Sequence, residues 1–207
     1  MSAGLVWRGG WIALLALIYG AFFLWYGGAS APLTPTEGEA LMARIQALHG
    51  GTSSAGLHPE FQPNVQALIA NDDGREFFMI NLDTMIDTPE ARAADRAYAG
   101  IVIPLLLARG SFPIFAGRTQ GKVLGEAADG IQRVAVVRYR SLRDFLDMNA
   151  DPAMKLGAPH KFASMAHTEV FPTAPLFTAV QVRLTVGLVF VVLVFIGLAV
   201  MRRFGRA

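Results

Sequence analysis

The strongest constraint on this chain is a run of 18 residues without a charged side chain, from Leu184 to Met201. At 1.5 Å per residue, an α-helix of that length spans roughly 27 Å, close to the hydrocarbon thickness of a bilayer. The whole chain is 53% hydrophobic with a mean hydropathy of +0.41, too apolar for a purely soluble protein of its size. We therefore predict a transmembrane helix within residues 174–207.

A second apolar run extends from Trp11 to Tyr26 and carries aromatic residues near both ends, as helices do where they cross the membrane interface. The small residues 29–31, followed by Pro32, also fit the cleavage site of a signal peptide. The run is long and aromatic for a signal peptide. We therefore predict an uncleaved transmembrane helix within residues 1–28, with cleavage as the alternative.

Small residues on both predicted helices favour close helix packing. Ala16 and Gly20 are four residues apart on the first helix, and Gly187 lies on the second. Such residues allow another helix to approach closely in a bilayer. We predict that these three positions contact other integral membrane proteins.

Basic residues lie at the terminal ends of the two apolar runs. Arg8 precedes the first run and Arg202, Arg203 and Arg206 follow the second, whereas the segment after the first run begins without lysine or arginine. Cytoplasmic flanks carry the excess of such residues. The sequence predicts two spans of a bacterial inner membrane, both termini cytoplasmic, and residues 29–175 periplasmic. Arg183 is the exception, and its long side chain can reach the lipid headgroups.

Residues 29–75 predict a helical linker region. Thr34 and Glu37 form a capping box around Pro35, and apolar residues then recur at helical spacing, which predicts a helix over 35–49. A shorter helix is predicted to end near Asn71. Neither helix carries a recognisable catalytic pattern, so we interpret the region as a connection between the first span and a domain.

Residues 76–173 predict an α+β domain with the order β-α-β-β-α-β. The predicted strands are 76–83, 112–117, 131–140 and 166–172, and the predicted helices are 89–109, 142–149 and 152–164. With right-handed crossovers, this order gives a four-stranded antiparallel sheet with helices on one face, the ferredoxin-like arrangement.

The strings "MINLDTM", "ARGSFPIFAG", "VVRYRSLRDFLDMNADPAM" and "HTEVFP", with Tyr98 and Pro104 between them, resemble small proteins of the dimeric α/β-barrel superfamily. The resemblance covers about residues 65–172. It implies a homodimer formed through the sheet face. That superfamily includes cofactor-free monooxygenases, haem enzymes, isomerases and proteins without known activity, so the resemblance does not imply one function. Two flanking membrane helices are a departure from its usual members.

Polar side chains in this domain give a set of candidate site residues. Alternation along the first strand places Phe78, Ile80 and Leu82 on one face of the sheet. The other face of the sheet is the candidate cavity face. The residues on that cavity face are Phe77, Met79, Asn81 and Asp83. Asn81, Arg138 and His160 would be the catalytic or ligand-binding set if the domain has a cavity. A weaker alternative is a metal site formed by His160, His167 and Glu169.

Several chemistries are not supported. The chain has no cysteine, which excludes disulfides, thiolate catalysis and iron–sulfur clusters. It has neither a phosphate-binding loop nor a dinucleotide fingerprint. We predict no cofactor. The formal charge of only +2 gives little support to nucleic-acid binding.

Two function classes remain. The first is a membrane-anchored accessory or scaffolding subunit, in contact with lipids and other membrane subunits, whose outer domain braces a larger complex. A respiratory or photosynthetic complex would fit, although no residue identifies one. The second is a membrane-tethered enzyme or small-ligand binder that uses the cavity of the α/β domain. An open pocket lined by Asn81, Arg138 and His160 would favour the second class.

Overall fold

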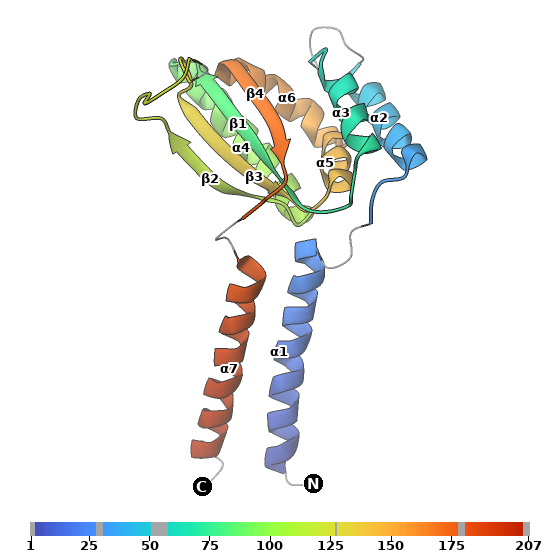
Figure 1. The fold of residues 1–207 in the computed structure, drawn as a ribbon. Helices are drawn as coiled ribbons and strands as arrows, with labels where there is room; N and C mark the ends of the chain where they lie inside the picture. The colour runs from blue at the N-terminus through green and yellow to red at the C-terminus, as the bar shows by residue number, and fades with distance from the viewer. Residues whose placement is uncertain (1–2, 28–30, 51–57, 127, 178–180, 205–207) are drawn as a thin grey trace. The chain divides into compact units, whose positions relative to one another are not determined.

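The computed structural model describes residues 3–27, 31–50, 58–126, 128–177 and 181–204. They divide into two compact units, one made of residues Met1–Ala29 and Leu176–Ala207 and the other of Ser30–Pro175. The chain is an α+β domain flanked by a long apolar helix at each end, as predicted (Figure 1). Positions 29 and 30 of the alternative cleavage site, and Arg206 of the basic tail, lie outside the described residues.

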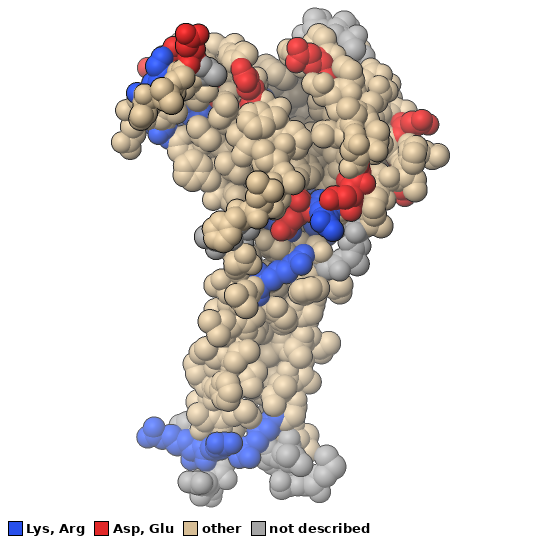
Figure 2. Space-filling view, viewed as in Figure 1, with Lys and Arg blue, Asp and Glu red and all other residues tan. Residues whose placement is uncertain are grey.

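The first unit is a pair of helices, α1 (Ala3–Gly27) and α7 (Val182–Phe204), which lie side by side (Figure 1). Both are long and apolar enough to cross a membrane. Their apolar side chains are largely exposed, so neither helix is the core helix of a folded domain in this chain. Basic side chains gather at the end of the pair nearest the chain termini, and uncharged side chains cover most of its length (Figure 2).

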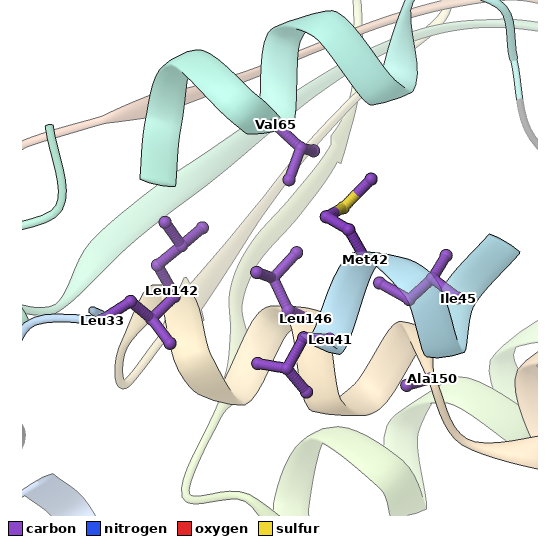
Figure 3. Close-up of a cluster of buried hydrophobic side chains, with 8 residues drawn as sticks. All are labelled: Leu33, Leu41, Met42, Ile45, Val65, Leu142, Leu146 and Ala150. Carbon is purple, nitrogen blue, oxygen red and sulfur yellow. The ribbon is translucent and has the colours of Figure 1, made fainter. Parts of the chain in front are cut away.

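Three helices form a core of their own in the second unit. They are α2 (Pro35–His49), α3 (Phe61–Ala70) and α5 (Leu142–Asn149), and their apolar side chains point toward one another (Figure 3). The buried residues of this cluster are Leu33, Leu41, Met42, Ile45, Val65, Leu142, Leu146 and Ala150. Most of residues 29–75 therefore belongs to the same compact unit as the sheet.

The sheet has the strand order β2-β3-β1-β4, which is the order of the predicted βαββαβ arrangement. Its strands are β1 (Phe77–Met85), β2 (Phe112–Arg118), β3 (Arg133–Tyr139) and β4 (Met165–Thr173). All three pairings are antiparallel. The central strand β1 pairs Met79 with Val137 of β3 and with Pro172 of β4, which fixes the residues that share each face.

Helix starts follow the local sequence closely. The Thr34 side chain accepts a hydrogen bond from the Glu37 N–H in a complete capping box, and the Ser141 hydroxyl accepts one from Asp144 N–H at the start of α5. Asp151 caps α6 (Pro152–Ser164) in the same way. Because these interactions lie within a few residues of each other, the predicted bounds of α2, α5 and α6 agree with the structure.

Two helices, α4 (Pro89–Ala108) and α6, lie together on one face of the sheet (Figure 1). The core beneath them contains Met79 and Tyr139 from the sheet, Val102 and Leu106 from α4, and Met154 from α6. The helices therefore cover the face that carries the odd-numbered residues of β1. The prediction that Phe77, Met79, Asn81 and Asp83 line an open cavity is wrong, because helix side chains fill that face.

Candidate functional site

Asn81 lies in the middle of β1, beneath the helix layer, and is half-buried. Its side-chain amide is 3.4 Å from the carbonyl oxygen of Met79 and 3.4 Å from that of Ala135 on β3. Both contacts are long for an N–H···O hydrogen bond and both involve neighbouring backbone. Among the described residues, Asn81 thus bonds to neighbouring backbone and to no polar side chain.

Arg138 lies on the opposite face of the sheet, since it pairs with Phe78 rather than with an odd-numbered residue of β1. Only 1% of its side chain is exposed. Nε donates to Glu76 Oε2 at 2.7 Å, Nη1 donates to the carbonyl of Gly110 at 2.7 Å, and the guanidinium carbon is 5.5 Å from the centre of the Phe112 ring. A buried charge is tolerated when it is paired in this way. Arg138 ties the start of β1 to the turn before β2.

The structure does not bring Asn81, Arg138 and His160 together. Asn81 and Arg138 are on opposite faces of the sheet, and His160 belongs to α6. The expected pocket lined by all three is therefore not formed. The sequence could not show this, because it does not reveal which residue of β1 lies opposite Arg138.

The weaker metal alternative fails for a similar reason. His167 and Glu169 pair with Thr84 and Leu82, so they lie on the sheet face opposite to the helices, whereas His160 is on a helix. His167 Nε2 is 3.5 Å from Glu169 Oε1, and both side chains are exposed. Over the described ranges, no group of three His, Asp or Glu side chains is close enough to hold a metal ion.

A cluster of charges that the sequence analysis did not identify lies between the sheet and α4. Asp83, 2% exposed, accepts hydrogen bonds from Arg133 Nε at 2.9 Å and from the Thr168 hydroxyl at 2.7 Å. Nη1 of Arg133 also donates to both carboxylate oxygens of Asp95 on α4, at 2.8 and 3.0 Å. The arginine is thus shared by two carboxylates and fastens the helix to the sheet. Only the position of Asp83 on the odd-numbered face was visible in the sequence.

Two further titratable groups adjoin this cluster. Burial, with a smaller contribution from the charge of Asp83, raises the pKa of Tyr98 to about 12. Burial also lowers the pKa of Lys161 on α6, and the negative charge of Asp83 partly opposes that shift. In this cluster two carboxylates share one guanidinium. We interpret it as a stabilising network.

An open hollow lies between α2 and α5. Its lining residues are Glu37, Ala40, Leu41, Arg44, Arg143, Asp144 and Asp147. The charges on its rim are paired with one another or with neighbours: Arg143 binds Glu37 at 3.0 Å and Arg44 binds Asp147 at 3.5 Å. Arg140 donates to Asp144. The pairs Arg143–Glu37 and Arg44–Asp147 connect α2 with α5, and we interpret the charges of the hollow as structural.

In the helix pair, two aromatic side chains of α1 pack against glycines of α7. A Cβ built on Gly187 would lie 3.1 Å from the Tyr19 hydroxyl oxygen, and one built on Gly197 would clash with Trp11 Nε1. The Trp11 indole donates to the carbonyl of Leu193 at 3.3 Å. These glycines let the aromatic side chains of α1 reach the backbone of α7. Gly187 packs against α1 of the same chain, and its predicted contact with other membrane proteins stays a prediction.

The other two predicted packing positions differ from Gly187. A Cβ built on Gly20 meets no atom within 4 Å among the described residues, apart from its own helix backbone and chain neighbours. Ala16, one turn earlier, is exposed. This side of α1 is therefore not covered by α7.

Comparisons with known proteins support the fold of the domain and give no information on its function. No protein-family model matches the chain, and no curated protein matches it significantly. Two solved structures are similar: methylated RPA0582, and RPA0582, described as a protein of unknown function from Rhodopseudomonas palustris. Each has a TM-score of 0.51 and 20% sequence identity; they cover 62% and 61% of this chain and 98% and 100% of their own. At this identity the likeness extends to the fold and not to activity.

Proposed function

We propose that the chain is an accessory subunit of a larger assembly in the bacterial inner membrane. In this proposal α1 and α7 both span the bilayer, the termini are cytoplasmic and the domain Ser30–Pro175 lies on the periplasmic side, where it braces its partners. The basic residues at the terminal ends of the helices support this orientation. The specific contacts of Trp11 and Tyr19 with α7 support a first helix that is retained, since a signal peptide that is removed has no need of them.

The observation that carries the proposal is the uncovered small-residue side of α1. The glycines of α7 are occupied by aromatic rings of α1, but Gly20 and Ala16 have open space beside them. In a bilayer, helices associate through close van der Waals contact at small residues, because lipid offers no hydrophobic driving force. This side of α1 therefore fits a helix of another membrane protein.

The test is purification of the full-length chain in mild detergent with identification of the proteins that accompany it. Gly20→Leu should reduce the accompanying membrane proteins about tenfold, corresponding to the loss of roughly 1.4 kcal/mol of binding free energy. Ala21→Leu is the matched control, because it adds the same kind of side chain about 100° further around the helix. Equal recovery of partners with both variants would contradict docking through Gly20.

We further propose that the domain forms a homodimer through the sheet face opposite to the helices, as its resemblance to dimeric α/β-barrel proteins implies. Phe115 on β2 is 55% exposed and Phe171 on β4 is 42% exposed. Both pair with residues of that face, Val136 and Ile80 respectively. Large exposed aromatic side chains on the sheet face opposite to α4 and α6 are typical of a protein–protein contact.

The alternative, an enzyme or ligand binder using Asn81, Arg138 and His160, has less support. It needs a common pocket for residues that lie on different layers of the domain. The accessory role therefore remains our proposal, and the variants that separate the two hypotheses are given in the Discussion.

A further inference from the structure

Arg183 is held in a defined position at one end of the helix pair. It is the second residue of α7, and its Nη2 donates to the carbonyl of Gly27, the last residue of α1, at 2.9 Å. Its guanidinium carbon is 4.9 Å from the ring centre of Phe23 and 5.0 Å from that of Tyr26. Stacking on two rings and a bond to a helix C-terminus fix the cation before any ligand arrives.

The charge of Arg183 has no counter-ion in its own unit. Residues 1–29 and 176–207 contain no aspartate or glutamate. Among the described residues of this unit, Arg183 forms no ion pair, and its Nε is buried without a hydrogen-bond partner. Nη1 likewise has no hydrogen bond to a described residue of the helix pair. An unpaired cation that is partly removed from water is unfavourable, so an anion at Nη1 would be bound strongly.

The surroundings of Arg183 indicate which anion fits. It lies at the ends of both predicted spans, which is the depth of the lipid headgroups. Leu184, the next residue of α7, and Leu24, in the last turn of α1, are exposed and apolar, as expected for residues in contact with acyl chains. Guanidinium groups bind phosphate oxygens well because of their planar set of donors. A phospholipid supplies both the phosphate and the chains.

We propose that Arg183 binds the phosphate of a phospholipid headgroup in the leaflet on the domain side of the membrane. The bound lipid would neutralise the arginine and fill the junction between α1 and α7. This inference rests on the membrane anchoring in the proposed function, but it does not depend on the identity of any partner protein.

The experiment uses the full-length chain in mild detergent, with bound lipid measured by native mass spectrometry. Phosphatidylglycerol is the probe, and diacylglycerol, which lacks the phosphate, is the control lipid. Arg183→Gln should retain about tenfold less phosphatidylglycerol than the wild type. Arg202→Gln, at the other end of α7, should retain as much as the wild type. Diacylglycerol should not be retained by any of them.

Three outcomes decide the proposal. Equal retention of phosphatidylglycerol by the wild type and Arg183→Gln would overturn it. Displacement of the lipid by millimolar inorganic phosphate would also overturn it, because the site would then bind free phosphate rather than a lipid. If Arg183→Gln does not fold, Arg183→Lys keeps the cation but loses the planar donors, and the proposal requires reduced but measurable retention.

Anchoring is tested separately by extraction of membranes with alkaline carbonate. A wild-type chain released by carbonate would disprove the membrane anchoring itself and this inference with it. A chain that resists carbonate, combined with unchanged lipid retention in Arg183→Gln, would disprove only the lipid site.

Discussion

Tyr19 of α1 lies against Gly187 of α7, where its hydroxyl oxygen would be 3.1 Å from a Cβ and donates to the carbonyl of Arg183 at 3.3 Å. Its ring is also 5.6 Å from that of Phe190. The Tyr19 side chain thus packs into the space beside Gly187 that a larger side chain would occupy. This contact, together with that of Trp11 at Gly197, makes the two apolar helices a specific pair within one chain.

Enlarging Gly187 should therefore damage the chain itself. Gly187→Leu forces the Tyr19 side chain away from α7, and overpacking of this kind typically costs about 1–3 kcal/mol. We expect a lower thermal midpoint of the full-length protein in detergent. Gly20→Leu, where a side chain has room, should leave that midpoint unchanged while it reduces partner binding. A reduction of the midpoint by Gly20→Leu but not by Gly187→Leu would show that the helices pair in another way.

Two adjacent residues of β3 should respond differently to the same substitution. Val137 pairs with Met79 and packs beneath the helices, whereas Val136 pairs with Ile80 on the opposite face. Val137→Asp places an unpaired carboxylate in the core, at a cost of several kcal/mol, and should unfold the domain. Val136→Asp should leave the domain folded and disrupt the proposed homodimer. Circular dichroism and light scattering measure the two effects, and unfolding by Val136→Asp alone would reverse the assignment of the faces.

The helices cover the sheet face that was predicted to line a cavity, and this error shows which features the sequence can predict. Alternation along β1 correctly separates Phe78 and Ile80 from Met79 and Asn81, but both sets are rich in apolar residues. Nothing local therefore indicates which set the helices cover. The bounds of α5 and α6 were predictable because Ser141 and Asp151 form caps with residues close in sequence. The shared Arg133 and the partners of Arg138 depend on strand register, which is a non-local property.

The pH dependence of stability should reflect Glu37. Hydrogen bonds from Arg143, and then from the backbone and side chain of Thr34, lower the pKa of Glu37 from 4.5 to about 2. A carboxyl whose pKa is lower in the folded state stabilises the fold above its unfolded pKa, and this stabilisation is lost as the pH falls from about 4.5 to about 2. Glu37→Gln should therefore be less stable than the wild type at pH 7, with the difference vanishing near pH 2.

The measurement is the thermal midpoint of the full-length protein between pH 7 and pH 2. Glu39→Gln is the control, since Glu39 is an exposed residue of the same helix outside the capping box. If the thermal midpoints of the wild type and Glu37→Gln change with pH in the same way, the capping box and the ion pair with Arg143 do not contribute to stability in solution.

The enzyme hypothesis makes a different prediction for Asn81 and His160. The hydrogen bonds of Asn81 are long and go to the backbone, so Asn81→Ala should cost no more than about 1 kcal/mol of stability. We expect Asn81→Ala and His160→Ala to leave the purified assembly intact and any activity it has unchanged. Loss of turnover in either variant, with the assembly still whole, would favour a catalytic domain over an accessory role.

The most direct test of the accessory role is the composition of the particle that contains the wild-type chain. Membranes are solubilised in mild detergent, the chain is captured by a tag at Ala207, and the accompanying proteins are quantified by mass spectrometry. Our account predicts at least one other integral membrane protein in a fixed ratio to the chain. Purification of the 22.3 kDa chain alone, or only with copies of itself, would contradict it.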